Sequence, residues 1–470
     1  MRAPPLLAMI GLCLSASGAW AQAPAGGDFD TVVANYVAEG LRSNLALQSQ
    51  HLEVEKAAEA LSEARARFFP ELSFEARYTR ADGGRVIDIP IGSALNPVYS
   101  TLNEMLIAQG QPARFPQVAN ESIPFLRTEE QDTRLLLRQP LYAPAIPAAV
   151  RAQRALLDAS SFNRMAIARA LRRDITVAYV DWLKARSSVE IVAASEALLQ
   201  ENLRVNESLY GNGKITEDLV LRAKAELLEV EQQKRETQNL ATQAQSYFNF
   251  LLNRQLQSSI EPTAPPNNAT GSEAALEQLW SMALNRRPEI AQNEQLRRAS
   301  EEQVRIARKQ KWPTLSLGVD AGTQGEDYRF GDGYNFGTAS LIFTWRLFDG
   351  GGDTARVHQA RAAEKQLVLR QEEIAQQIRL EVQQSYDRLT TARDSLATAA
   401  ARAEAARAAF RIASRKRDEG VISQVEFIDA RSALTGAELN HNLTRFNVLA
   451  RRAELEYATS TGDIPLDPGV

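Results

Sequence analysis

Few side chains in this sequence have the spacing that catalysis or metal binding requires. The three histidines, His51, His358 and His441, stand singly, and the one cysteine is Cys13, so no group of residues has the spacing of a metal site. The segment 331–337, GDGYNFG, superficially resembles a phosphate loop. It joins two amphipathic strands and no helix follows it, which favours a hairpin turn. The sequence therefore predicts neither an enzyme nor a cofactor or metal site.

The chain begins with the pattern of a secretory signal. Arg2 is the only charged residue among positions 1–21, a short apolar run covers 6–14, and small residues precede the expected cleavage point. We expect residues 1–21 to be removed, and Cys13 with them. Because Cys13 follows a leucine and not a small residue, we expect no lipid anchor on it.

The composition excludes several classes of protein. The chain is 44% hydrophobic and 24% charged with a net charge of −4, which is neither basic enough for nucleic acid nor typical of a disordered protein. No later segment contains about 18 consecutive apolar residues. An exported protein of this kind is periplasmic, secreted or an outer-membrane β-barrel, and the strand pattern must decide among them.

The sequence consists largely of two similar halves, which form an internal repeat. Residues 65–80 parallel 308–323, and the heptapeptide YGNGKIT at 210–216 parallels RDEGVIS at 417–423. We expect a first structural repeat over 22–261, a linker over 262–272, a second repeat over 273–461 and a C-terminal tail over 462–470. The first repeat carries an additional segment, 82–127, which is too long for an ordinary loop.

Four segments alternate between apolar and polar residues and predict strands in two hairpins, near 70–80, 132–141, 312–322 and 338–348. Each strand then has one apolar face and one polar face. The polar face would carry Glu75, Arg77, Asp320 and Arg346.

The remaining sequence predicts helices of unusual length. Residues 148–210 and 354–419 contain no glycine or proline, which corresponds to roughly 95–100 Å of helix each. From Ala375 to Ala413 a heptad seam of mostly small and apolar residues has Ser385 as its only polar member. Such a seam favours close packing of long helices.

The two heptapeptides lie where each long helix must reverse. Gly213 and Gly420 supply the backbone freedom of a tight turn, and Thr216 and Ser423 can cap the returning helices. Each repeat therefore runs from helix through two strands into a long helical hairpin.

Four strands with one lipid-compatible face suit the wall of an outer-membrane barrel. Four strands cannot close a channel, and an open sheet edge in lipid is forbidden. The chain must therefore associate with identical copies to complete its barrel.

In this order of elements the chain resembles the TolC family of outer-membrane efflux proteins. The resemblance rests on the tandem repeats, the strand entries FFPEL and KWPTL, the strand exit LFDGG and the paired helical tips. It implies a mostly helical protein with four strands per protomer, which completes a 12-strand trimeric barrel continued by a periplasmic helical tunnel. It also implies a periplasmic adaptor and an inner-membrane transporter as partners, for the efflux of drugs and other small molecules.

The resemblance also implies roles for particular residues. The tip residues would contact the adaptor: Gly213, Ile215, Thr216, Gly420, Ile422 and Ser423. A purely hairpin-shaping role is the alternative. Glu426 and Asp429, spaced i and i+3 on one helix face, match positions where the family places acidic rings that constrict the pore. A solvated helix face is the alternative. Glu75, Arg77, Asp320 and Arg346 would line the barrel lumen.

Two other functions fit parts of this pattern. The outer-membrane duct of a type I protein secretion system shares every feature above. A periplasmic coiled-coil adaptor or scaffold would explain the helices, but it would not need four amphipathic strands. The segment 82–127 is expected outside the cell, where the long loops of such barrels lie.

Overall fold

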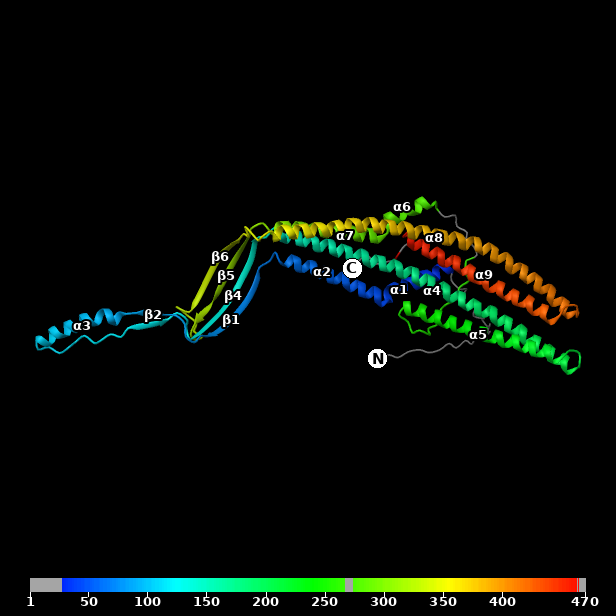
Figure 1. Ribbon diagram of the computed structural model, residues 1–470, viewed down its shortest axis with the longest axis horizontal. Coiled ribbons are helices and arrows are strands. Elements are labelled where there is room, and N and C mark those ends of the chain that lie inside the picture. Colours follow the sequence, from blue (N-terminus) through cyan, green and yellow to red (C-terminus); the bar gives the residue numbers. More distant parts are fainter. Residues whose placement is uncertain (1–27, 267–273, 463, 465–470) are drawn as a thin grey trace, which may run out of the picture. The chain divides into compact units, whose positions relative to one another are not determined.

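The computed structural model describes residues 28–266, 274–462 and 464 (Figure 1). The expected signal peptide lies outside these residues, as do parts of the expected linker and C-terminal tail. The first half contains α1 (Phe29–Ser43), α2 (Leu45–Ala66), β1 (Glu71–Arg80), β2 (Val86–Ile89), α3 (Ile91–Ala108), β3 (Glu121–Pro124), β4 (Glu129–Tyr142), α4 (Ala145–Gly211) and α5 (Glu217–Leu251). The second half contains α6 (Leu276–Arg286), α7 (Pro288–Lys309), β5 (Thr314–Gly325), β6 (Asn335–Thr344), α8 (Gly352–Asp418) and α9 (Gln424–Ala458).

The two halves are built from elements of matching length. Helices α2 and α7 each have 22 residues, the long helices α4 and α8 each have 67, and the returning helices α5 and α9 each have 35. Within the described residues only the segment β2–α3–β3 has no counterpart in the second half. The structure therefore contains the internal duplication that the sequence repeat indicates.

Each half begins with two helices instead of the single helix expected from the sequence. Asn44 separates α1 from α2, and its side-chain Oδ1 accepts hydrogen bonds from the N–H groups of Ala46 at 3.0 Å and Leu47 at 3.2 Å. Arg287 separates α6 from α7 with nearly the same extended backbone angles, and Pro288 follows as the first residue of α7. An asparagine cap and a proline at the first helical position are both favourable ways to restart a helix.

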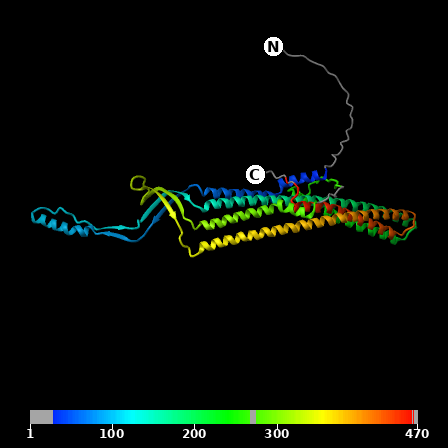
Figure 2. The same cartoon turned by 90° about the horizontal axis from the view of Figure 1, so that it is seen from above.

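The chain folds into two compact units. The helical unit comprises Met1–Leu52, Asn163–Ile290 and Glu373–Val470, and the sheet unit comprises Glu53–Phe162 and Ala291–Glu372. In the helical unit, α4 runs beside α5 and α8 runs beside α9, so that two helical hairpins form (Figures 1 and 2).

The helical unit has an aromatic core around Tyr179, which is completely buried. The rings of Phe29, Tyr36 and Phe248 lie 4.9–6.0 Å from one another or from Tyr179, centroid to centroid. The Tyr179 hydroxyl donates to the carbonyl oxygen of Glu261 at 2.8 Å, as a buried phenol requires. This core joins α1, α4 and α5.

A second core lies along α6, α8 and α9 and contains part of the predicted heptad seam. Ile378, Val382 and Leu389 are buried there. Ser385, the polar member of the seam, is buried as well. All twelve seam positions between Ala375 and Ala413 are buried or half-buried, which confirms the predicted periodicity.

The sheet unit contains a four-stranded antiparallel sheet in the order β1-β4-β5-β6 (Figure 1). The predicted fold class, long helices with a four-stranded sheet, is confirmed. One strand is shorter than expected, since β6 ends at Thr344, and the segment expected to continue it to 348 has no strand structure. Strands β1 and β6 are the edges of the sheet.

One face of this sheet is apolar and exposed. Residues directly opposite each other in the ladder share a face, and the register pairs Leu72 with Leu137, Phe74 with Leu135 and Leu341 with Leu317. Exposed large apolar side chains on this face are Leu72, Phe74, Tyr78, Leu135, Leu341 and Phe343. No element of the described chain covers them.

The additional segment of the first half is not an irregular loop. Strands β2 and β3 pair antiparallel, and between them lies the 18-residue helix α3. We call residues 86–124 the finger. Asn96 and Asn103 in α3 fasten the returning chain: Asn96 exchanges two hydrogen bonds with the backbone of Val118 at 2.8 and 2.9 Å, and Asn103 does the same with Phe115 at 2.7 and 3.0 Å.

Among the helices of the described residues, none combines the length and the apolar character that crossing a membrane would take.

Candidate functional site

Both helical hairpins turn through the same backbone motif. Gly213 and Gly420 have φ of +67° and +71°, a left-handed conformation that glycine adopts without strain. The Gly213 N–H donates to the carbonyl of Tyr210 at 2.8 Å, and the next N–H donates to Leu209 at 2.9 Å. The same two bonds occur at Gly420, at 2.9 and 2.7 Å. This is the Schellman motif, so the two glycines have the turn-forming role expected from the sequence.

The two returning helices start differently. Ser423 caps α9 through a capping box with Glu426. Thr216 occupies the corresponding position before α5 with extended backbone angles, but its side chain makes no capping hydrogen bond. The third residue of α5 is Leu219, which cannot complete a capping box. The expected cap is therefore confirmed for Ser423 and wrong for Thr216.

The apolar residues expected at the tips are less exposed than a docking role would suggest. Ile215 and Ile422 are both half-buried, so solvent exposure does not single them out. The exposed apolar side chains at the turns are Val421, 66% exposed, and Tyr210, 46% exposed. A signal in the sequence could have marked Val421 as a tip residue: it directly follows the turn glycine, a position that is often apolar.

An aromatic stack fixes the second tip. The guanidinium of Arg417 lies 4.1 Å from the ring centroid of Phe427, and the Phe410 ring lies 5.6 Å from the same ring. Phe427 is buried. These contacts join the end of α8 to the start of α9, so the backbone of the second turn is held by packing as well as by hydrogen bonds.

The acidic residues predicted at a pore constriction have different surroundings. Glu426 and Asp429 are both exposed. The Glu426 carboxylate accepts a hydrogen bond from the N–H of Ser423 at 3.3 Å, so it also serves the helix start. Asp429 lies near Glu226 of α5, and its charge contributes to raising the pKa of Glu226.

Glu226 belongs to a charged cluster that sequence reasoning missed. Burial is the main reason that its pKa lies above the usual value, with the charge of Glu229 second. Arg431 of α9 is 3% exposed, and its positive charge acts in the opposite direction by lowering the pKa of Glu226. Burial lowers the pKa of Arg431 itself. Because the cluster joins α5 to α9 across about 200 positions of sequence, no local pattern could have indicated it.

On the polar face of the sheet, the predicted lumen residues form cross-strand pairs. Glu75 contacts Arg134 at 3.2 Å and Arg77 contacts Asp132 at 3.3 Å, and each pair is directly opposite in the β1–β4 register. Asp320 accepts a hydrogen bond from the Thr338 hydroxyl at 3.2 Å. These residues lie on the face opposite to the exposed apolar side chains.

Arg346 is the exception among the predicted lumen residues. It follows the end of β6 and lies 3.9 Å from Asp353 of α8. Its placement in the fourth strand was therefore wrong. The alternation continued past Thr344 in the sequence, but the backbone leaves the ladder there to enter α8.

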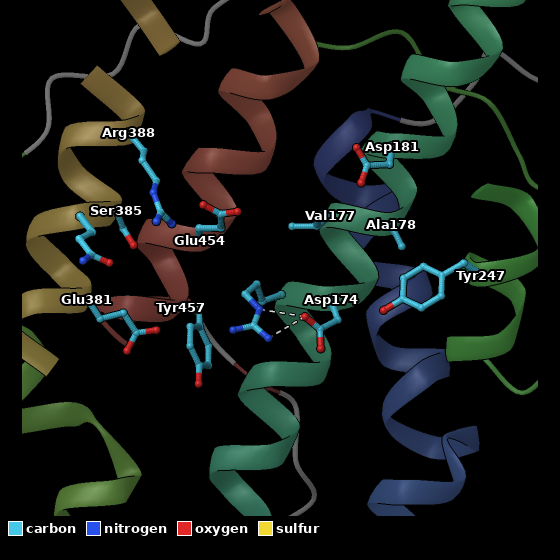
Figure 3. A pocket seen from close by; sticks show the side chains of 12 residues that line it. Asp174, Val177, Ala178, Asp181, Tyr247, Glu381, Ser385, Arg388, Glu454 and Tyr457 are labelled. Atoms are coloured by element: carbon cyan, nitrogen blue, oxygen red, sulfur yellow. Dashed lines mark hydrogen bonds and ion pairs between the residues drawn. The ribbon is translucent and has the colours of Figure 1, made fainter. Parts of the chain in front are cut away.

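The helical unit contains a polar cleft of about 370 Å³. Figure 3 shows Glu381, Ser385 and Arg388 of α8 facing Glu454 and Tyr457 of α9, with Asp174 of α4 nearby. The guanidiniums of Arg173 and Arg287 lie 4.4 and 4.8 Å from the ring centroid of Tyr457.

The cleft offers charges of both signs but no histidine or cysteine among its lining residues. In the part of the chain that the structure describes, no group of three or more histidine, cysteine or acidic side chains could hold a metal ion. The cleft can therefore hold water and polar solutes, and its geometry indicates no catalytic chemistry.

Solved structures with this fold are outer-membrane channels. The CmeC outer membrane channel of Campylobacter jejuni matches with a TM-score of 0.72 at 17% identity, over 97% of this chain and 94% of that chain. The open state of the MtrE outer membrane channel of Neisseria gonorrhoeae matches with a TM-score of 0.71 at 16% identity, over 92% of this chain and 89% of that chain. At these identities the likeness shows the fold.

Two sequence comparisons match part of the chain. Residues 279–461 match the family described as outer membrane efflux protein. Protein CyaE of Bordetella pertussis is 29% identical over 179 residues, and this match spans 38% of each chain. The second repeat is therefore similar to outer membrane efflux proteins, and the chain spans 38% of the length of its curated relative. This is the class of protein that the sequence resemblance implied.

Proposed function

We propose that this protein is the outer-membrane channel of a tripartite efflux system. It would passively conduct drugs and other small molecules, delivered by an inner-membrane transporter and a periplasmic adaptor, to the exterior. The observation that supports the proposal best is the four-stranded sheet, which has an exposed apolar face, a charged opposite face and two unpaired edges.

The open edges support assembly from identical copies. Strands β1 and β6 each have 10 residues, about the length that a tilted strand needs to cross the bilayer core. Their unpaired backbone groups could not remain free in lipid. Pairing of β1 with β6 of the next copy satisfies them, and three copies make the 12-strand barrel that the family resemblance implies.

The helical unit also has apolar surface that one copy does not cover. Exposed large apolar side chains recur along α5: Leu221, Leu228, Leu240, Tyr247 and Phe250. Contiguous exposed apolar surface marks interaction sites. In a trimer these side chains would pack against the helices of a neighbouring copy and seal the tunnel wall.

The tips supply a surface for the adaptor. Both turns present a rigid Schellman backbone, and the second turn adds the exposed side chain of Val421. The predicted tip residues would shape this surface, with Val421 as its apolar contact: Gly213, Ile215, Thr216, Gly420, Ile422 and Ser423. In a trimer, three copies of Asp429 would form a ring of carboxylates around the channel axis. This ring would favour cations at the periplasmic entrance.

Two measurements test the channel itself. The purified protein should migrate as an oligomer in detergent gels until it is boiled, and it should form conducting pores in planar bilayers. A monomeric protein that is soluble without detergent would exclude the proposal. Export of an unfolded polypeptide instead of small molecules, in cells that contain the cognate transporter, would favour the type I secretion alternative. The periplasmic scaffold alternative leaves the exposed sheet face unexplained.

The constriction is tested by a cysteine at position 429. The single cysteine of the sequence, Cys13, lies in the expected signal peptide, so Asp429→Cys would be the only thiol of the processed chain. Oxidation should cross-link neighbouring subunits in the resting channel. An intact oligomer without cross-links would remove Asp429 from the constriction.

A further inference from the structure

The finger contains the most apolar surface that the channel proposal leaves unused. Along α3 six large apolar side chains are exposed, and five of them form a stripe: Ile91 by 38%, Leu95 by 37%, Val98 by 54%, Leu102 by 37% and Met105 by 58%. The sixth, Ile107, is 62% exposed and lies off this stripe near the end of the helix. The five stripe residues recur at alternating intervals of four and three. In heptad notation Leu95 and Leu102 take position a, and the other three take position d.

The returning chain of the finger leaves this stripe open. Asn96 and Asn103 both fall at position b, beside the stripe, and bind the backbone of Val118 and Phe115. The Tyr99 ring also packs on Phe115, with the centroids 5.3 Å apart. The finger therefore has a closed side, where the chain returns, and an open apolar side formed by positions a and d.

We propose that the α3 helices of neighbouring copies pack against one another through this stripe as a short coiled coil. This inference rests on the proposed assembly of the channel from identical copies. A repeat of 3.5 residues is the pattern with which helices interlock in register with their own kind. Leucine at position a with isoleucine at position d favours bundles of three or four helices over pairs, and in α3 the d residues Ile91 and Val98 are both β-branched.

Two further features support packing of α3 against α3 of a second copy: the connection of the finger to the sheet, and the charges of α3. The finger leaves β1, the edge strand that must pair with the next copy, so an assembly that shares sheet edges brings several fingers together. Glu104 is the only charged residue of α3. It falls at position c, away from the seam, so identical helices would meet without like charges in their interface. Pro97 also falls at position c, where it leaves the seam uninterrupted.

Cysteine cross-linking with a matched control tests the packing. Leu102→Cys places a thiol in the seam, and Ser100→Cys places one on the opposite side of the same helix turn. In the purified oligomer, oxidation should join neighbouring chains through Cys at 102 and leave the Ser100→Cys protein uncross-linked. Cross-linking of both variants, or of neither in an intact oligomer, would overturn the inference while leaving the channel proposal standing. A monomer by native mass measurement would overturn both.

A second variant separates packing of the seam from burial of α3 in lipid or in another protein. Adding Leu95→Glu to the Leu102→Cys chain puts carboxylates into the seam one heptad, about two helical turns, away. The oligomer should persist, because the sheet edges are unchanged, but the cross-link should disappear and the thiol should become reactive to a bulky maleimide. The alternative is tested with the Leu102→Cys protein alone, labelled at its thiol with a polarity-sensitive dye. If the dye emission shifts to the blue only in lipid vesicles and the thiol forms no cross-link, the outer leaflet covers the stripe and the inference is wrong.

Discussion

The hydroxyl of Ser423 accepts a hydrogen bond from the N–H of Glu426 at 3.3 Å, while the Glu426 carboxylate accepts one from the N–H of Ser423 at the same distance. This reciprocal pair starts α9 directly after the second tip. Glu426 therefore has a local structural role whether or not it also faces a pore, and the two roles can be separated by mutation.

Ser423→Ala should destabilise the start of α9 by about 1 kcal/mol. The hydroxyl acceptor is lost, and local opening of the first turn should increase about fivefold. Amide hydrogen exchange of the first turn of α9 measures this change. Thr216→Ala is the control, because Thr216 occupies the same position before α5 without a side-chain capping bond. Equal effects of the two substitutions would contradict the capping assignment.

Arg287→Met should destabilise the helical unit by about 1–3 kcal/mol, because it removes a buried guanidinium that is ion-paired with two partly exposed carboxylates. Arg287 is 7% exposed and contacts Glu289 at 2.9 Å and Glu381 at 3.0 Å. Thermal unfolding in detergent measures the loss. The adjacent Arg286 is exposed, so Arg286→Met should change stability by no more than about 0.5 kcal/mol. An effect at Arg287 as small as that at Arg286 would contradict a stabilising role for these ion pairs.

Leu341→Arg should impair insertion of the sheet into the membrane by about 2–4 kcal/mol, since it places a charge on the lipid face. Ser340→Arg, one residue earlier on the opposite face, should be tolerated. Leu341 is 69% exposed in the single chain, so neither substitution removes packing within it. The amount of folded oligomer in the outer membrane is the measurement. If Ser340→Arg proves the more damaging of the two, the assignment of the sheet faces is reversed.

Glu226→Gln should make the protein more stable than the wild type at about pH 8 but not at about pH 4. The pKa of Glu226 is raised in the folded state, mainly by burial and then by Glu229. The folded wild type therefore binds this proton more tightly than the unfolded chain does, and this contribution to stability is lost as the pH rises through the folded-state pKa. Glutamine cannot ionise and avoids that loss. Unfolding midpoints at the two pH values test the sign, and a variant that is less stable at pH 8 would contradict it.

Local patterns in the sequence were enough to predict the main elements. Alternation located the strands, the absence of glycine and proline located the long helices, and Gly213 and Gly420 marked both turns. These signals are local because backbone conformation and side-chain periodicity depend on neighbouring residues. The break at Asn44 was missed, since an asparagine within a helical pattern does not by itself mark an end.

The candidate site was less accessible to sequence reasoning. Arg431 meets Glu226 only because α9 folds back along α5, and that pairing has no counterpart in local spacing. Val421 is exposed and Ile422 is half-buried, and this difference depends on how the turn packs in three dimensions. Arg346 was misplaced because alternation of side chains can outlast the hydrogen-bonded ladder that defines a strand.

The finger is closed by its own two-stranded ribbon and by the two asparagines that hold its returning chain, whereas the equivalent hairpin of the second half has only the connection 326–334 between β5 and β6. One sheet thus carries a minimal and an elaborated version of the same connection. We therefore expect this position to accept insertions: in the channel proposed above, foreign peptides grafted between β1 and β4 should reach the cell surface without disturbing export.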